Sequence, residues 1–313
     1  MLRILYGTAG TGKSAAIMDE IRRGADSGER YILLVPEQYS HEAERELCAV
    51  CGDGLSLYAE VLSFTGLARE ISSECGGAAN EYLDKGGRLL CMALAADGLY
   101  SRLRVYGAAR RKAELQTMLL GAVDEFKSAC VTSERLLDAA ETCEGALGDK
   151  LHDLGLILEA YDGVVANGRA DPYDRLSVLA QQIGQCSMSE RTHVFVDGFT
   201  DFTAQERRVL EALLLKGVRL TVCLGCDELH GGSEVFALSR ITASALLKFA
   251  ADNGIKAQTE RRDGESIKAK PLGEFCENMF SYRAVEAGDA QGRIKIISAA
   301  DTNAECEFAA AEA

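Results

Sequence analysis

Several features that define simpler classes of protein are missing from this chain. It has no tryptophan and only three prolines in 313 residues, and no apolar run approaches the roughly 18 residues of a membrane span. Hydrophobic residues make up 47% and charged residues 26%, which excludes a disordered chain and indicates a globular protein of about two domains. Met1 leads directly into an apolar run, so we expect no signal or transit peptide, no membrane contact and a cytoplasmic location.

The chain also has fewer basic than acidic residues. Lys and Arg number 34 against 48 Asp and Glu, which gives a net charge of −14. A nucleic-acid-binding surface normally carries a basic footprint, so any contact with DNA must be local or made by parts outside this sequence. One basic run stands out, and it comprises Arg102, Arg104, Arg110, Arg111 and Lys112. It is either a phosphate-contacting patch or a solvated turn between two helices.

Cysteine, by contrast, is common, with eleven residues in the chain. We expect these cysteines to be reduced in a cytoplasmic protein. Cys48/Cys51 and Cys223/Cys226 have C-x-x-C spacing. Together they can make a four-thiolate zinc site. The alternative is that they are small hydrophobic side chains, because Cys223 lies in an apolar, strand-like run.

The strongest motif is at the start of the chain. An apolar run at 2–6 is followed by a glycine-rich stretch and then by a helix-compatible stretch at 15–21. The glycine-rich stretch consists of Gly7, Thr8, Ala9, Gly10, Thr11, Gly12, Lys13 and Ser14. It fits the phosphate-loop pattern G-x-x-x-x-G-K-[ST] without a mismatch, in the strand–loop–helix context that the pattern requires.

The residue types in this loop suit the binding of a nucleoside triphosphate. Glycines let the backbone turn its N–H groups onto phosphate oxygens, and the start of the helix adds the positive end of its dipole. Lys13 is expected to reach the β- and γ-phosphates, and the Ser14 hydroxyl to ligate Mg²⁺. The alternative is a glycine turn that only joins a strand to a helix.

The rest of the chain alternates between two patterns. Apolar runs predict strands, and with the helical stretches between them they indicate a parallel α/β sheet. These runs lie at 2–6, 31–35, 55–62, 193–197, 218–224 and 293–297. From about 81 to 182 helical periodicity dominates. We therefore predict a sheet domain at 1–75 and 186–290, a helical insertion domain at 76–185, and the truncated start of a following domain at 291–313.

Two further site residues follow predicted strands. Asp197 ends the strand at 193–197, and Gln38 comes soon after the strand at 31–35. Ligand sites gather at the carboxyl ends of parallel strands. We expect Asp197 to coordinate Mg²⁺ from a strand that lies beside the phosphate loop, although an aspartate here can also cap a loop. We place Gln38 among the nucleotide-binding residues.

This layout resembles the motor domain of superfamily 1 helicases. The phosphate loop looks like motif I, residues 35–38 look like motif Ia, and residues 61–68 resemble a DNA-contacting stretch of UvrD-like helicases. Val196 and Asp197 with Gln205 resemble motif II and its trailing glutamine, and residues 222–227 sit where motif III is expected. The resemblance implies a RecA-like P-loop NTPase sheet that is split by a large all-helical insertion.

Five stretches are closer to one family, the B subunit of the AddAB (RexAB) helicase–nuclease. The stretches are G-T-A-G-T-G-K-S, L-V-P-E-Q-Y-S, A-E-V-L-S-F-T-G-L-A, V-D-G-F-T-D-F-T-A-Q-E and R-I-K-I-I-S-A-A-D-T-N-A-E-C-E-F-A-A-A-E. The resemblance covers nearly all of this chain but only the amino-terminal quarter or so of a typical member. It implies part of an ATP-dependent helicase and exodeoxyribonuclease (a hydrolase) that repairs double-strand breaks in DNA by recombination, as a heterodimer with an A subunit. The family's nuclease domain with its 4Fe–4S cluster lies outside this sequence, so none of the eleven cysteines is assigned to that cluster.

One departure from the helicase pattern concerns hydrolysis. Active helicases carry a glutamate directly after the motif II aspartate, where it polarises the attacking water, and here that residue is Gly198. Asp201 and Glu206 are nearby but have solvent or capping roles. The arginine finger of such motors belongs to a second motor domain outside this sequence. Because losing a positioned base costs about 10²–10⁴-fold, we expect the chain to bind ATP–Mg²⁺ through Lys13, Ser14 and Asp197 but to hydrolyse it poorly.

Three functions remain open at this point. The leading one is the ATP-binding, helicase-like domain of a DNA-repair nuclease subunit. The second is a catalytically silent scaffold for DNA and the partner subunit, which need not bind nucleotide. The third is an unrelated phosphate-loop kinase, which predicts phosphoryl transfer without DNA and leaves the helical insertion unexplained.

Overall fold

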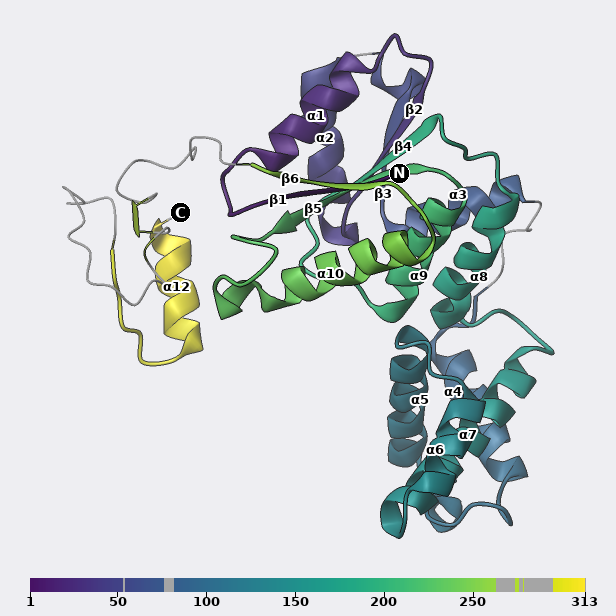
Figure 1. The fold of residues 1–313 in the computed structure, drawn as a ribbon. Coiled ribbons are helices and arrows are strands. Elements are labelled where there is room, and N and C mark those ends of the chain that lie inside the picture. The colour runs from purple at the N-terminus through teal and green to yellow at the C-terminus, as the bar shows by residue number, and fades with distance from the viewer. Residues whose placement is uncertain (53, 76–81, 263–273, 276–277, 279–294, 313) are drawn as a thin grey trace.

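A six-stranded, all-parallel sheet forms the centre of the molecule (Figure 1). The computed structural model describes residues 1–52, 54–75, 82–262, 274–275, 278 and 295–312. The strands lie in the order β3-β2-β4-β5-β1-β6. Their bounds are β1 (Leu2–Gly7), β2 (Arg30–Leu34), β3 (Ala59–Leu62), β4 (Thr192–Val196), β5 (Arg219–Gly225) and β6 (Ala257–Arg261). The predicted α/β class is therefore confirmed.

Two of the strand predictions need correction, and one strand, β6, was not predicted. The run at 55–62 begins with a 3-10 turn, Leu55–Leu57, and pairs as a strand only from Ala59. β6 has no apolar run because it is an edge strand whose residues mostly face solvent. The strand predicted at 293–297 is not present over Lys295–Ile297, and Arg293 and Ile294 lie outside the described residues.

Helices cover both faces of the sheet, and each face has its own apolar core. On one face lie α1 (Lys13–Arg23) and α2 (Ser40–Cys51), packed on side chains such as Leu5 and Phe195. On the other lie α3 (Phe64–Glu74), α8 (Arg175–Gln182), α9 (Ala204–Leu215) and α10 (Ala237–Asp252), packed on side chains such as Ile4 and Val194. Successive strand residues point to opposite faces, so continuous apolar strands supply both cores.

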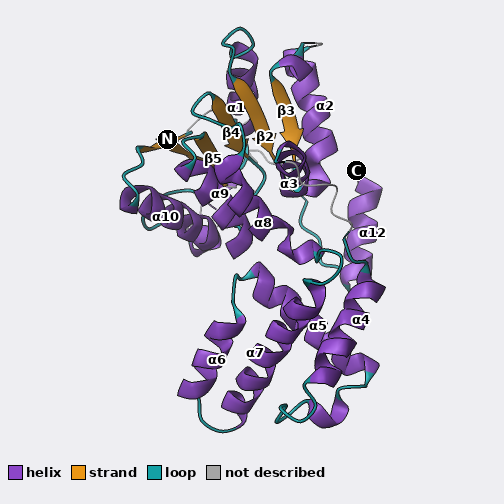
Figure 2. Cartoon of the chain, turned by 90° about the vertical axis from the view of Figure 1, so that its right-hand side faces the viewer, coloured by secondary structure: helices purple, strands orange, loops and turns teal. Residues whose placement is uncertain are grey.

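The helical stretch forms a bundle of its own below the sheet (Figure 2). It consists of α4 (Lys85–Gly98), α5 (Ala113–Ser128), α6 (Ser133–Thr142) and α7 (Ala146–Val165). A third core, with Met92 and Tyr161 fully buried, lies between these helices. The helical character predicted for this stretch is confirmed where it is described, and residues 76–81 lie outside the described part.

The basic run lies in the turn between α4 and α5, and three of its five cations contact carboxylates. Arg110 and Arg111 both contact Asp97, at 3.0 and 3.1 Å, and Arg104 contacts Asp149 at 2.9 Å. Asp97 belongs to α4 and Asp149 to α7, so the bundle itself supplies the acids that face these arginines. The arrangement favours the solvated turn over the phosphate-contacting patch.

A buried polar cluster joins the bundle to the sheet. Asp171 precedes the 3-10 turn Pro172–Asp174 and is fully buried between Arg88 of α4 and Lys127 of α5. Gln205 of α9 donates hydrogen bonds to the Tyr173 carbonyl at 2.7 Å and to Ser177 at 3.0 Å. The glutamine that trails Asp197 in sequence therefore ties the sheet to the turn that carries the cluster.

The last described helix, α12 (Thr302–Glu312), buries none of its residues. This helix falls in the predicted following domain, of which Ala313 and residues 291–294 lie outside the described residues. Among the described residues, no helix combines the length and the apolar character that crossing a membrane requires.

Candidate functional site

The glycine-rich loop connects β1 to α1 at the carboxyl edge of the sheet. Gly10 and Gly12 have φ values of 85° and 77°, in the left-handed region that favours glycine. Gly12 caps α1 without a side-chain hydrogen bond, and the first turn of α1 contains no acidic residue. The first N–H groups of α1 have no partner within the helix, and no acidic residue of its first turn compensates the positive end of its dipole, which suits an anion.

The strand order places a topological switch point at this loop, the position at which open α/β sheets have their ligand-binding crevice. The helix after β1, α1, packs on one face of the sheet through Ile17 and Ile21. The helix after β5, α10, packs on the opposite face through Ala243 and Leu246. β1 and β5 are neighbours, so the connections that follow them run to opposite faces of the sheet. The space between two such connections is where α/β sheets bind ligands.

Lys13 lies over the loop. Its Nζ donates hydrogen bonds to the carbonyls of Gly7 at 2.7 Å and Thr8 at 2.8 Å. Burial lowers the pKa of Lys13, while the nearby Cys223 and Asp197 act in the opposite sense. The ammonium group is thus held at the crevice within electrostatic reach of Asp197.

Asp197 follows β4, and here the strand prediction was wrong in one respect. β4 pairs with β2 and β5 and is not a neighbour of β1. One strand lies between the two, so Asp197 and the loop start about 10 Å apart along the sheet edge. Local sequence cannot show which strands are adjacent, because adjacency depends on where each crossover returns. Ser14 lies exposed in the first turn of α1, and no hydrogen bond among the described residues links it to Asp197.

Gln38 lies farther from the loop. It is exposed on the 3-10 turn Glu37–Tyr39 that follows β2. β2 is three positions from β1 in the sheet, which corresponds to about 14 Å. Within the described residues no hydrogen bond joins Gln38 to the loop, so its contact with nucleotide stays a prediction.

The end of β6, with Arg262, lies beside the loop and was not predicted from the sequence. The Arg262 backbone N–H donates to the Tyr6 carbonyl at 2.8 Å, which extends the β6 pairing past Arg261. A Cβ on Gly7 would stand 2.6 Å from the Arg262 carbonyl and 2.7 Å from Thr11 Oγ1. Only glycine therefore fits where β6 closes against the loop. This edge strand is polar, so it lacks the apolar run from which the other strands were predicted.

The cysteine pairs do not meet. Cys48 and Cys51 lie on α2, while Cys223 and Cys226 are buried on and just after β5. Among the described residues, no group of three or more His, Cys, Asp or Glu side chains could hold a metal ion. Burial raises the pKa of the Cys223 thiol, which disfavours the thiolate that zinc requires. The small-hydrophobe interpretation is favoured for the buried Cys223 and Cys226, whereas Cys48 is exposed.

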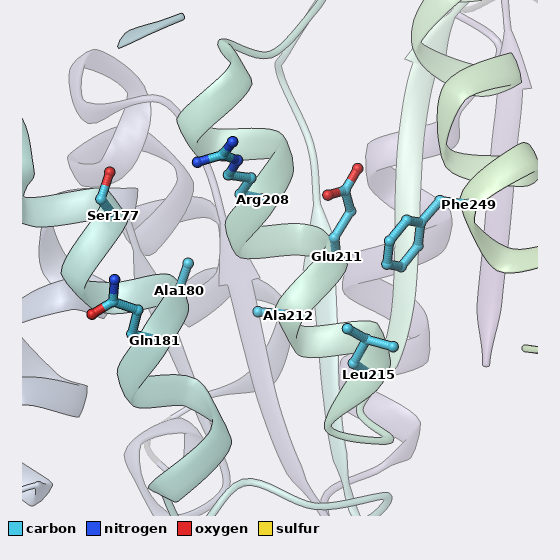
Figure 3. A pocket seen from close by; sticks show the side chains of 8 residues that line it. All are labelled: Ser177, Ala180, Gln181, Arg208, Glu211, Ala212, Leu215 and Phe249. Atoms are coloured by element: carbon cyan, nitrogen blue, oxygen red, sulfur yellow. The ribbon is translucent and has the colours of Figure 1, made fainter. Parts of the chain in front are cut away.

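A hollow of about 260 Å³ lies away from the loop, between α8, α9 and α10 (Figure 3). Ala180 and Gln181 line it from α8, Arg208 and Glu211 from α9, and Phe249 from α10. These helices cover the face of the sheet opposite α1. The hollow is therefore not part of the crevice that the glycine-rich loop forms.

The position after Asp197 is shaped for glycine. Gly198 has a φ of 82°, and a Cβ there would meet the Pro36 ring at 3.2 Å. Glu206 is occupied as a helix cap, since it accepts hydrogen bonds from the Thr203 N–H at 2.8 Å and hydroxyl at 3.0 Å. Asp201 is exposed. A water-polarising glutamate cannot be placed at 198 without backbone strain.

Gly198→Glu is therefore expected to lower the free energy of unfolding by about 1–2 kcal/mol, the cost of a left-handed backbone in a residue with a side chain. Chemical denaturation measures the loss. Gly184→Ala is the matched control, because a Cβ at Gly184 meets nothing within 4 Å and its φ lies outside the left-handed region. Equal stability of the Gly198→Glu variant and the wild type would contradict this account of the position.

Taken together, the parallel sheet, the glycine-rich loop after its first strand and the helix that follows define an α/β protein whose glycine-rich loop lies at the carboxyl edge of the sheet. Residues 4–273 match the family described as "ADDB, N-terminal", and the chain belongs to this family. The resemblance found in the sequence is confirmed.

Curated relatives agree with this assignment, and each of them is named as the B subunit of an ATP-dependent helicase/deoxyribonuclease. The chain is 33% identical over 327 residues to the relative from Desulforudis audaxviator, with 99% of this chain and 28% of the relative covered. It is 30% identical over 322 residues to the relative from Thermoanaerobacter sp., again with 99% and 28% covered. The relative from Clostridium acetobutylicum is 30% identical over 291 residues, with 90% of this chain and 25% of the relative covered. The chain thus spans little more than a quarter of these relatives.

Proposed function

We propose that this chain is the ATP-binding, helicase-like part of the B subunit of an ATP-dependent helicase/deoxyribonuclease, with a RecA-like P-loop sheet. The observation that carries the proposal is the position of Lys13, whose ammonium lies over the loop at 2.7 and 2.8 Å from two loop carbonyls and within reach of Asp197. Residues 7–14 bind the phosphates. Ser14 and Asp197 are the residues that would hold Mg²⁺, which supplies charge neutralisation for the phosphates when bound.

The fit of these residues to a nucleotide rests on two further observations. The start of α1, which has no side-chain cap, offers N–H groups, and the left-handed glycines Gly10 and Gly12 shape the loop around them. The crevice lies where neighbouring strands send their helices to opposite faces. The 4Fe–4S cluster that the family resemblance implies is assigned to no residue of this chain.

We extend the proposal to the whole protein by analogy with its relatives. The sheet domain at 1–75 and 186–290 and the helical domain at 76–185 act on DNA during double-strand-break repair by recombination, with residues 291–313 starting a further domain. The partner is the A subunit in a cytoplasmic heterodimer. With a charge of −14, tight binding to DNA needs the rest of the complex. In isolation the chain binds ATP–Mg²⁺ but hydrolyses it slowly, because the residue directly after Asp197 is Gly198 and not a glutamate. A turnover near one per second would overturn this part.

The test is a titration with a fluorescent ATP analogue and Mg²⁺. The intact chain is expected to bind in the micromolar range, and Lys13→Ala to bind about 50-fold more weakly, because a charged hydrogen-bond donor to phosphate is lost. Lys85→Ala, an exposed lysine at the start of α4, is the matched control and should bind as the wild type does. Absence of binding to the wild type, or equal affinity in the Lys13→Ala variant, would favour the scaffold function instead.

A further inference from the structure

We propose that Arg262 is a second phosphate-binding cation of this site, which reaches the polyphosphate of the nucleotide from the β6 side of the loop. The inference rests on the proposed function, because it names an additional residue for the same site. It begins from the pairing of β6 with β1, in which Leu5 is opposite Glu260 and Tyr6 is opposite Arg261. The hydrogen bond from the Arg262 N–H to the Tyr6 carbonyl carries this register one residue further, to the level of Gly7.

The register also decides which way the side chain points. Side chains two apart in a strand share a face, so Arg262 shares the face of Glu260 and Leu5. Leu5 packs with Ile17 and Met18 of α1. The ion pairs agree with the face that the register predicts. Arg262 Nη1 lies 3.4 Å from Glu260 Oε1, and Glu260 in turn lies 3.9 Å from Arg3. Arg262 therefore stands on the α1 side of the sheet, where the loop turns into its helix.

Arg262 is also close to the loop along the strand direction. Its carbonyl oxygen would be 2.6 Å from a Cβ on Gly7, the first residue of the glycine-rich motif. Arg261, one residue earlier, belongs to the opposite face, and its guanidinium lies 3.9 Å from Glu228 in the loop after β5. The side chains of Arg261 and Arg262 therefore lie on opposite faces of the sheet, and that of Arg262 is on the face that α1 covers.

The charge of the crevice favours this role. ATP is a polyanion, and the chain as a whole has a net charge of −14, so binding needs local cations. Arg240, at the start of the other helix beside the crevice, is committed to Asp227 at 3.4 Å and to the Ser233 carbonyl at 2.7 Å. The Arg262 side chain is 40% exposed, and the Glu260 carboxylate 3.4 Å away is also near Arg3. A guanidinium in this setting can turn its fork of N–H donors to phosphate oxygens.

The test uses the full chain, with fluorescent ATP and ADP analogues and Mg²⁺. Arg262→Ala is expected to weaken the binding of the ATP analogue about tenfold, the lower end of the loss for a charged hydrogen bond, because the side chain is partly solvated. Arg261→Ala is the matched control on the same strand and should change the affinity less than about twofold, since its side chain is on the other face of the sheet. Arg262→Lys should recover part of the loss, because it restores the charge without the fork.

A gain-of-affinity variant keeps the inference testable if Arg262→Ala does not fold. Glu260→Gln removes the carboxylate beside Arg262 and is expected to tighten binding of the ATP analogue about two- to threefold, because a partly exposed ion pair contributes little. Wild-type affinity in both Arg262→Ala and Glu260→Gln, with binding still dependent on Lys13, would overturn the role of Arg262 and leave the proposed function standing. Loss of Lys13 dependence would instead overturn the proposed function.

Discussion

Replacing Asp171 with asparagine is expected to lower the free energy of unfolding by about 3 kcal/mol, because it removes the central acid of a buried charge cluster. The Asp171 side chain is fully buried, with Arg88 Nε at 3.1 Å and Lys127 Nζ at 3.3 Å. The Tyr161 hydroxyl donates to it at 2.8 Å and the Tyr173 N–H at 3.0 Å. The contact with Arg88 Nε is an ion pair without the alignment of a hydrogen bond.

The expected loss is near the lower end of what a broken buried pair costs, about 3–5 kcal/mol, because both cations keep other partners. Arg88 retains Asp124, and Lys127 retains Asp162 and Asp174 at 2.9 and 2.7 Å. The pKa of Asp171 is low, because its backbone and cationic partners hold it down against burial, so the carboxylate is the form that the fold uses. The amide of asparagine cannot supply that charge.

Urea unfolding monitored by circular dichroism measures this loss. Asp149→Asn is the matched control, because Asp149 pairs with Arg104 on the surface at 2.9 Å with 45% of its side chain exposed. Exposed pairs contribute about 0–1 kcal/mol, so this control should remain close to the wild type. The affinity for the ATP analogue should not change in the Asp171→Asn variant, because the cluster lies at the bundle and not at the loop. A loss no larger than that of the control would show that the cluster does not stabilise the junction.

The second large effect concerns pH. His193 of β4 is buried, its Nε2 lies 2.9 Å from Thr221 Oγ1, and its ring stacks on Phe195 with centroids 3.9 Å apart. Burial lowers the pKa of His193 from 6.5 to about 3, and the charges of Arg219, Arg3 and the amino terminus act in the same direction. Glu29 acts in the opposite direction but does not compensate. The folded protein therefore keeps this imidazole neutral where the unfolded chain protonates it.

This difference in protonation decides in which direction the free energy of unfolding changes with pH. Above pH 6.5 the group is neutral in both states and its contribution to stability is complete; as pH falls from 6.5 towards 3, the unfolded state gains a proton that the folded state does not bind. The free energy of unfolding should fall by about 1.4 kcal/mol per pH unit from this group, which is about 2 kcal/mol at pH 5 and of the order of 4 kcal/mol across the window.

The measurement is the free energy of unfolding of wild type and His193→Gln at about pH 7.5, 6 and 5, which spans the start of the expected loss. Glutamine can keep a hydrogen bond to Thr221 but does not titrate, so the stability of the variant should fall less steeply than that of the wild type. His41→Gln, an exposed histidine on α2, is the control and should follow the wild-type slope. Identical slopes for wild type and His193→Gln would refute the assignment of acid sensitivity to this residue.

Local patterns in the sequence were sufficient for much of this protein. The loop at 7–14 could be predicted because its motif consists of consecutive residues. These are glycines for the turn, followed by Lys13 and Ser14 at the helix start. The same holds for the capping box of Thr203 and Glu206, which is present at the start of α9. β4 and β5, buried along most of their length, read as strands because an interior parallel strand is apolar throughout.

Features that depend on neighbours in space were missed or misplaced. The position of β5 between β1 and β4, and the distance of Gln38 from the loop, follow from the strand order alone. The pairing of Arg104 with Asp149 and of Arg110 with Asp97 could not be read from the basic run in the sequence, because the acids belong to α7 and α4.

The sequence by itself determined the α/β class, the glycine-rich loop between a strand and a helix, the helical bundle and the family. The tertiary structure alone decided which strands are adjacent, that a polar edge strand lies beside β1, and that Arg262 stands next to Gly7 on the α1 side. The reason is physical. Periodicity and turn chemistry report what a residue's immediate neighbours in the chain require, whereas strand adjacency and ion pairing are set by crossovers that bring distant segments together and leave no local pattern.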